Sequence, residues 1–386
     1  MTELQQKDKT YIASTYNRFN LDLVKGKGSL FYSADGKEYI DMGSGIGVTA
    51  FGACDEEYVN AVTKQLNALQ HTSNLYFTNP CAELAEMLAT KTGLKKTFFA
   101  NSGAEANECA IKCAKKYAED KGVSNSVIIT LEQSFHGRTL ATLSATGQDT
   151  FHQNFLPLVD GFVHVPKNDL EVIKKIASEK PVSAVLIELI QGEGGVNALD
   201  FGYVTALYNY CKQNDILLIV DEVQTGNGRT GSLYAFMEYG ILPDIVTTAK
   251  GLGGGLPIGA CMLGEKVENV FTFGTHGSTF GGNPVCSAGA ISILKRLTPE
   301  FLNDVKRKSK IIFETLSNAE GVESVTGMGL MVGIKTKKPV KEVVAYCIEN
   351  GVLPLTAKDK LRLLPALNIS DELLEKALKV ILNALK

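Results

Sequence analysis

Short apolar runs alternate with helix-like stretches through the central part of the chain. The apolar runs are continuous, and they cover residues 97–100, 126–131, 184–190, 216–220 and 244–249. The stretches between them carry apolar residues at the spacing of amphipathic helices, over residues 80–92, 104–121, 170–179 and 203–214. Continuously apolar strands separated by helices are typical of a parallel sheet covered on both faces. This part of the chain is therefore predicted to be an α/β domain.

The end of the chain follows a different pattern. Two long helices, three short strands and an amphipathic helix are expected, in that order, over residues 286–297, 300–316, 322–334, 352–355, 361–364 and 373–385. Near the start, residues 29–32 and 37–41 flank a turn at Asp35-Gly36 and are expected to form a hairpin. We predict a large domain (46–285) and a smaller α+β domain (286–386), which the N-terminal segment (1–45) joins.

Composition and charge narrow the class of protein. The 386 residues suffice for two or three domains, and 45% hydrophobic with 21% charged residues is ordinary for a globular protein. A net charge of -3, without a basic stripe, argues against nucleic acid as the main partner. The polar, acid-containing start is not a signal peptide, and the apolar stretch at 182–190 is too short to cross a membrane.

The eight cysteines show no regular framework, which indicates a reduced, cytoplasmic protein. Cys109 and Cys113 lie one helical turn apart, a spacing that two metal ligands can have. No histidine nearby completes such a site, so buried free thiols are the default interpretation and no metal is expected.

Lys250 is the most informative residue of the chain. It follows the apolar run at 244–249 and precedes Gly-Leu-Gly-Gly-Gly (251–255). Desolvation at the end of a buried strand lowers the pKa of an amine and supplies the free amine that forms a Schiff base with an aldehyde. Asp221 ends another apolar run. An amine for an aldehyde and an acid for a pyridine nitrogen together indicate pyridoxal phosphate as cofactor, although most lysines elsewhere are simply solvated.

A second candidate feature is an anion site between the expected strand at 97–100 and the helix that follows. Ser102 and the backbone N–H groups of Gly103 and Ala104 would face an anion at this helix N-terminus. A plain N-cap serine is the alternative, and a phosphate cup becomes the better explanation opposite a cofactor lysine. Thr279, in a turn-rich segment, either donates to a phosphate or caps the next helix.

Two further loops follow expected strands and carry groups suited to a ring and a carboxylate. Phe135 can stack on a flat ring, and Arg138 can clamp a carboxylate with two hydrogen bonds. His136 between them is expected to be structural. Glu193 lies in a glycine-rich loop, either beside a substrate or as an ordinary loop carboxylate. The formal G-x-G-x-x-G at 226–231 does not directly end a first strand, so a dinucleotide site is rejected.

Together these segments resemble the class III (fold type I) aminotransferases, which depend on pyridoxal phosphate, and among them the acetylornithine aminotransferases. The resemblance covers nearly the whole chain. It rests on Asn-Ser-Gly-Ala-Glu-Ala-Asn (101–107), Phe-His-Gly-Arg-Thr (135–139), Gln-Gly-Glu-Gly-Gly (191–195), Asp-Glu-Val-Gln-Thr-Gly (221–226), Ala-Lys-Gly-Leu-Gly-Gly-Gly (249–255) and His-Gly-Ser-Thr-Phe-Gly-Gly-Asn-Pro (276–284). It implies a large domain with a mostly parallel seven-stranded sheet between helices, plus the smaller α+β domain.

The resemblance also implies roles for the cofactor residues. Lys250 would bind the cofactor aldehyde and shuttle the proton, and Asp221 would keep the pyridine nitrogen protonated. The remaining cofactor-binding residues would be Ser102, Gly103, Ala104, Phe135, Val223, Gln224 and, from the partner subunit, Thr279. A threonine donated across the interface implies an obligate homodimer with shared active sites.

For the substrate, the resemblance implies two carboxylate receptors, Arg138 and Arg362, and places Ser278 nearby. Glu193 would mask Arg362 when the ω-amino donor binds, and it would move away when glutamate needs both arginines. Two segments depart from the family pattern: Gly-Ala-Cys-Asp-Glu (52–56) stands where Gly-His-x-His-Pro is usual, and Leu189 stands where proline is usual. Because of the first departure, the sequence does not define how substrate would enter near residues 52–56.

The expected activity is transfer of the δ-amino group of N2-acetylornithine to 2-oxoglutarate, a step of arginine biosynthesis. Ornithine, succinyldiaminopimelate and 4-aminobutyrate remain alternative donors because sequence gives little information on the pocket around the acyl group. A non-catalytic regulatory protein that binds pyridoxal phosphate is an alternative from another class. Such a protein has no need of both arginines and the acid.

Overall fold

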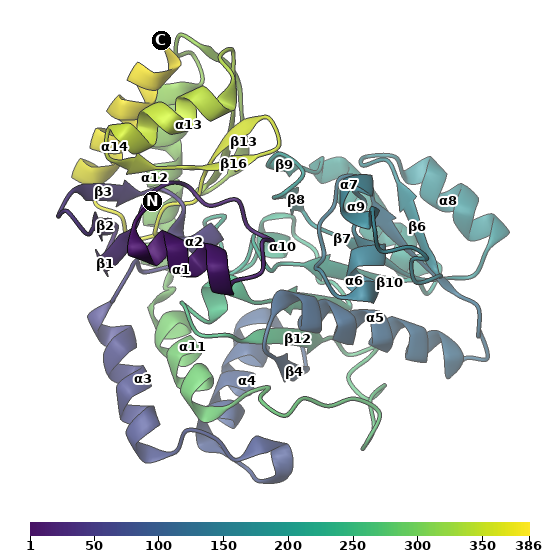
Figure 1. Cartoon of the computed structure of the whole chain (residues 1–386). Helices are drawn as coiled ribbons and strands as arrows, with labels where there is room; N and C mark the ends of the chain where they lie inside the picture. The colour runs from purple at the N-terminus through teal and green to yellow at the C-terminus, as the bar shows by residue number, and fades with distance from the viewer.

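A seven-stranded sheet forms the centre of the computed structural model, which describes residues 1–386 (Figure 1). Its strands are, in spatial order, β4 (Lys96–Ala100), β12 (Gly259–Leu263), β11 (Ile245–Thr248), β10 (Leu217–Asp221), β7 (Val182–Ile187), β5 (Val127–Leu131) and β6 (Phe162–Val165). All neighbouring strands are parallel except at β12, which is antiparallel to both of its neighbours. The expected mostly parallel sheet is confirmed.

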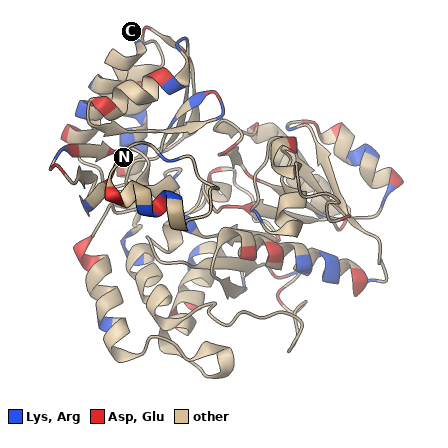
Figure 2. Ribbon diagram, viewed as in Figure 1, with Lys and Arg blue, Asp and Glu red and all other residues tan.

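Amphipathic helices cover this sheet. The helix α5 (Gly103–Glu119) buries a face of small and apolar side chains, while its Lys and Glu residues, coloured along the ribbon in Figure 2, are exposed or half-buried. Asp169 and Asp200 accept N-cap hydrogen bonds at the starts of α8 and α9. The other helices before residue 283 are α1 (Glu3–Tyr11), α2 (Ser44–Gly47), α3 (Glu56–Ala68), α4 (Asn79–Thr92), α6 (Leu140–Ala145), α7 (Asp149–His152), α8 (Leu170–Glu179), α9 (Phe201–Gln213) and α10 (Ala235–Glu238). None of the helices combines the length and apolar character needed to cross a membrane.

Segments from both ends of the chain share a second sheet. Its strands are β1 (Leu23–Lys27), β2 (Leu30–Ser33), β3 (Glu38–Asp41) and β15 (Val352–Leu353). The expected N-terminal hairpin is therefore confirmed, and parallel pairing of β3 with β15 joins it to the C-terminal module. The domain boundaries at residues 45 and 285 stay a prediction.

The C-terminal module contains a sheet of its own, which we call the C-terminal sheet. Its strands are β13 (Val322–Met328), β14 (Met331–Thr336), β17 (Lys360–Leu363) and β16 (Leu355–Ala357). The surrounding helices are α11 (Pro284–Arg296), α12 (Pro299–Leu316), α13 (Val340–Glu349) and α14 (Asp371–Leu385). The single strand expected at 322–334 was wrong: Gly329, at a φ of 59°, turns the chain between β13 and β14. The strand expected at 352–355 divides between two sheets, as β15 and β16.

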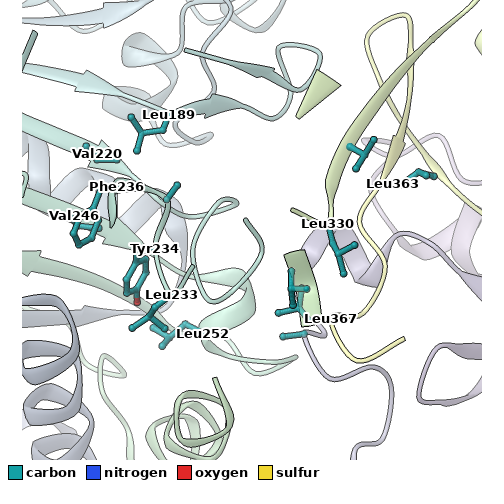
Figure 3. Close-up of a cluster of buried hydrophobic side chains, with 14 of the residues drawn as sticks. Leu189, Val220, Leu233, Tyr234, Phe236, Val246, Leu252, Leu330, Leu363 and Leu367 are labelled. Atoms are coloured by element: carbon teal, nitrogen blue, oxygen red, sulfur yellow. The ribbon is translucent and has the colours of Figure 1, made fainter. Parts of the chain in front are cut away.

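One hydrophobic core connects the large sheet to the C-terminal module. Figure 3 shows part of this cluster, which contains Leu189, Val220 and Val246 as well as Leu330 and Leu367. Burying these side chains stabilises the chain by roughly 1.5–3 kcal/mol for each large aliphatic residue. The two parts therefore fold against each other.

A buried guanidinium crosses the same boundary. Arg229, which is 2% exposed, donates from Nη1 to the carbonyl oxygens of Leu330 (3.2 Å) and Pro365 (2.5 Å). Burial lowers the pKa of Arg229 to about 10, and Asp41 acts in the opposite direction. The formal glycine motif at 226–231 therefore supplies a contact to the segments that carry Leu330 and Pro365.

Replacing Arg229 by methionine keeps an apolar stem but leaves the carbonyl oxygens of Leu330 and Pro365 without this donor. We expect Arg229→Met to lower the free energy of unfolding by about 3 kcal/mol, measured by urea denaturation at fixed protein concentration. Arg307→Met removes a half-exposed arginine paired with Asp304 and Asp371, and it should cost much less stability than Arg229→Met because exposed ion pairs are weak. Equal losses in the two variants would contradict a special role for the buried contact.

Candidate active site

A cavity of about 470 Å³ opens at the carboxyl ends of the central strands. Its size and position are those of a small-molecule site in an open α/β sheet. The predicted residues that line it are Ser102, Gly103, Ala104, Phe135, Arg138, Glu193, Asp221, Val223, Gln224 and Lys250. Most of the residues selected from separate loops of the sequence are therefore brought together here.

Lys250 is half-buried and lines the cavity, two residues beyond the end of β11 at Thr248. Its φ of 43° is in the left-handed region, a strain of about 1–3 kcal/mol that surrounding structure must hold. Burial lowers the pKa of its amine, which the carboxylates of Glu193, Asp221 and Glu188 counteract in part. The lowered pKa increases the fraction of free amine, in the direction expected from the sequence.

Asp221 ends β10 with a carboxylate that is held from several sides. Its Oδ2 accepts a hydrogen bond from Asn107 Nδ2 (2.7 Å) and lies 2.8 Å from His136 Nδ1, while Oδ1 accepts from the backbone N–H of Val223 (3.0 Å). These donors stabilise a buried negative charge. His136 therefore orients the acid, in agreement with the structural role expected for it.

The start of α5 faces the cavity with unpaired backbone donors. Ser102 is the N-cap, and its Oγ accepts from the backbone N–H of Glu105 (3.1 Å), so the capping alternative is confirmed. A Cβ on Gly103 would lie 2.7 Å from Cγ1 of Val223, so only glycine fits there. The N–H groups and dipole of this long helix form a suitable anion site.

Phe135 and Arg138 form the opposite wall of the cavity. The Phe135 ring contacts Phe151 edge-on, with 5.5 Å between the ring centroids. The guanidinium of Arg138 lies 4.2 Å from the centroid of Phe151, a cation–π contact. Arg138 makes no ion pair with a protein carboxylate, so its donors are free for an anionic ligand.

Arg362 reaches Glu193 from the C-terminal sheet. Its Nη1 donates to Glu193 Oε1 at 2.5 Å and to Gln224 Oε1 at 3.4 Å, while its Nε is buried without a partner. Burial alone would raise the pKa of Glu193, but the charge and hydrogen bond of Arg362 outweigh it and lower the pKa. The arginine and acid predicted as a pair are thus in contact.

Ser278 and Thr279 lie outside the cavity lining. Ser278 Oγ accepts from the backbone N–H of Gly281 (2.9 Å) and from Asn101 Nδ2 (3.4 Å), and Thr279 is exposed. The chain thus does not bring these two predicted residues together with its own cofactor site.

The segment at 52–56, which departs from the family pattern, also lies away from the cavity lining. Asp55 caps α3 by accepting from the backbone N–H of Tyr58 (3.0 Å) and pairs with Arg296 (2.7 Å). Its observed contacts are therefore structural.

Two residues of the site were not assigned from the sequence. Glu188 accepts from the backbone N–H groups of Phe135 (2.8 Å) and Gly192 (3.2 Å), which fixes two of the loops. Asn107 joins Asp221 to Thr247, whose Oγ1 donates to Asn107 Oδ1 (2.6 Å). A carboxylate inside the apolar run at 182–190 was the available signal for Glu188; Asn107 lies one helical turn after Gly103.

Comparison with known proteins agrees with this geometry. A model of the family "Aminotransferase class-III" matches residues 11–385. The chain belongs to the class-III aminotransferases. The chain is accordingly an aminotransferase, and its family uses pyridoxal phosphate as cofactor.

Individual class-III relatives cover nearly the full length. The chain is 49% identical to an acetylornithine aminotransferase of Haemophilus ducreyi, over 99% of this chain and 98% of that protein. Among solved structures, an ornithine aminotransferase from Toxoplasma gondii aligns with a TM-score of 0.95 at 30% identity, covering 99% and 94% of the two chains. An N-acetylornithine aminotransferase from Stenotrophomonas maltophilia aligns with a TM-score of 0.84 at 34% identity, covering 98% and 97%.

Glu188 generates a testable pH dependence for this aminotransferase. Burial raises its pKa to about 7 from the ordinary value of 4.5, so the folded protein binds a proton that the unfolded chain releases. The stability due to this proton is complete below pH 4.5 and is lost as pH rises through about 7. Between these pH values the native protein should lose up to about 3 kcal/mol of its free energy of unfolding through this group. Glu188→Gln should not show this loss.

The measurement is urea denaturation of both proteins at several pH values in that range. Glu171→Gln removes a carboxylate from the exposed side of α8 and should keep the pH dependence of the native protein. Parallel stability curves for Glu188→Gln and the native protein would show that Glu188 does not titrate there.

Proposed function

We propose that the chain transfers the δ-amino group of N2-acetylornithine to 2-oxoglutarate, giving N-acetylglutamate 5-semialdehyde and glutamate. The observation that carries the proposal is the Arg362–Glu193 pair beside the buried amine of Lys250. Relatives named acetylornithine aminotransferase at 49% and 44% identity support this choice of donor.

The residues of the cavity fit pyridoxal phosphate as cofactor. When bound, it would supply the aldehyde that accepts the amino group and a ring that withdraws electrons. Lys250 would hold the aldehyde, and Asp221 would keep the proton on the pyridine nitrogen. Phe135 and Val223 would enclose the ring and Gln224 would contact its hydroxyl, while Ser102, Gly103 and Ala104 would bind the phosphate.

Lys250 is also proposed to move the proton of the reaction. Its Nζ would take the proton from the substrate carbon that bears the amine and return it to C4′ of the cofactor. The lowered pKa increases the fraction of free amine that is available for this transfer. Glu188 and His136 would hold the loops and the acid in place around this path.

Arg138 and Arg362 are proposed as the receptors of the substrate carboxylates. With acetylornithine, which has one carboxylate, Glu193 would stay on Arg362. With glutamate or 2-oxoglutarate, Glu193 would leave, and both arginines would each bind one carboxylate. Arg362 also donates to Gln224, which supports a guanidinium that can bind either Glu193 or a substrate carboxylate.

A homodimer in the cytoplasm belongs to the same proposal. The exposure of Thr279 and of its neighbour Phe280 (59%) suits a segment that packs against a partner subunit. Thr279 would then reach the phosphate, and Ser278 the substrate, in the partner's site.

Ornithine is the second candidate donor, favoured by the TM-score of 0.95 with an ornithine aminotransferase. It differs from acetylornithine in carrying a free, charged α-amine. The reaction at the δ-carbon and the residues proposed for it are the same.

The cofactor assignment predicts the behaviour of Lys250→Ala. Purified native protein should show the visible absorbance of lysine-bound pyridoxal phosphate, and the variant should lose both this absorbance and at least about a thousandfold in kcat. Lys335→Ala, which removes a lysine paired with Asp359, should keep both. Turnover of Lys250→Ala at the native rate would rule out the proposed mechanism.

The donor assignment predicts the order of kcat/KM in a panel of amino donors with 2-oxoglutarate. Acetylornithine should exceed ornithine, succinyldiaminopimelate and 4-aminobutyrate, and it should exceed ornithine by about tenfold or more because the pocket distinguishes an acylated from a charged amine. A preference for free ornithine would replace the proposed donor and leave the chemistry unchanged.

A further inference from the structure

Glu193 is carried by a hairpin of unusual construction, which we call the gate hairpin (residues 190–198). Its strands are β8 (Ile190–Gln191) and β9 (Asn197–Ala198). Val196, in the turn between them, has a φ of 54°, which is unfavourable for a β-branched residue, and its side chain is fully buried. Such a turn persists only where other contacts hold it.

Those contacts come from the C-terminal sheet, beside which β9 lies in Figure 1. A separate small core joins the two, made of Ile190, Val196, Met331, Ala357 and Leu364. A Cβ on Gly333 of β14 would lie 2.8 Å from Cβ of Val196, so a bare backbone makes room for this side chain. The gate hairpin is thus packed on the same sheet that carries Arg362.

Two cations of β17 hold the two ends of the turn. Lys360 and Arg362 are two residues apart on this strand and therefore point to the same face. Arg362 binds Glu193, while Lys360 Nζ donates to Asn197 Oδ1 (3.0 Å) and to Thr326 Oγ1 (2.9 Å). Asn197 Nδ2 in turn donates to the carbonyl oxygen of Gly194 (2.9 Å), next to Glu193.

Lys360 makes no ion pair. The acid that precedes it, Asp359, pairs instead with Lys335, the residue opposite Lys360 on β14. The charged amine of Lys360 therefore donates to two neutral oxygens, those of Asn197 and Thr326. Hydrogen bonds from a charged donor are stronger than those between neutral groups. Neither Lys360 nor Asn197 lines the cavity.

We propose that Lys360 is a positioning residue which, through Asn197, determines how readily Glu193 leaves Arg362, and so sets the balance between substrates with one and with two carboxylates. The inference rests on the proposed function. The hydrogen bond that Lys360 donates to Asn197 favours the arrangement in which Glu193 neutralises Arg362, and the one to Thr326 of β13 holds Lys360 in place. Loosening the hairpin frees Arg362 for a second carboxylate.

The experiment compares Lys360→Met and Asn197→Ala with the native holoenzyme. KM and kcat are measured separately for 2-oxoglutarate and for the monocarboxylate donor. Both variants should lower KM for 2-oxoglutarate and raise KM for the donor, so that the ratio of the two KM values changes about three- to tenfold. Because both residues act through one contact, the double variant should change the ratio no more than either single variant.

Lys335→Met is the matched control, since it removes a lysine from the neighbouring strand of the same sheet. It should leave the ratio unchanged. A rise of KM for 2-oxoglutarate in Lys360→Met alone would show that Lys360 acts as an attracting charge, and would overturn the proposal. A fall of kcat or stability at an unchanged ratio would show a merely structural lysine, and would overturn it as well.

Hydrogen exchange of the gate hairpin separates this inference from the proposed function. In the holoenzyme, backbone amides of residues 192–196 should exchange faster in Lys360→Met and Asn197→Ala than in Lys335→Met or the native protein. If the native protein transaminates no donor, the proposed function fails and the substrate balance fails with it. If the native protein is active and exchange is unchanged in all variants, the positioning role alone is wrong.

Discussion

The register of β10 against β11 is the constraint on which the site depends. It places Asp221 opposite Thr247, three residues before Lys250. Asn107 of α5 bonds to both Asp221 and Thr247, so the register also sets the position of the helix whose first turn faces the cavity. A slip of one residue would turn every side chain of the strand to the other face. The acid, the amine and the helix N-terminus are therefore positioned by one pairing.

Hydrogen-bond and charge partners explain why several ionisable groups can be buried together. A buried charge without partners would cost many kcal/mol, and none of the acids here lacks them. Asp221 has three donors, Glu188 two backbone N–H groups, and Glu193 the guanidinium of Arg362. Lys250 has no hydrogen-bonded partner within the chain, and burial lowers the pKa of its amine.

Much of this arrangement was predictable because chemistry-bearing residues interrupt or end apolar runs. The ends of the runs at 216–220 and 244–249 gave Asp221 and Lys250, and loops after other strands gave Phe135 and Glu193. Asn107 and Glu188 were not assigned because their importance depends on which strand ends become neighbours. The hairpin at 322–336 was predicted as one strand since Gly329 and Leu330 leave the apolar run almost continuous. The role of Arg229 could not be inferred from the sequence because its partners, Leu330 and Pro365, lie more than a hundred residues away along the chain.

The position of the gate hairpin follows from the free-energy cost of burying the charge of Arg362 without an anion beside it. Arg362 is 3% exposed, so its charge needs an anion whether or not the substrate brings one. An acid attached to the large sheet would change its distance from Arg362 with any movement between the two parts of the chain. Glu193 avoids this because its hairpin packs on the sheet that contains Arg362. Competition between Glu193 and a substrate carboxylate is then decided by local hydrogen bonds, which include those of Lys360 and Asn197.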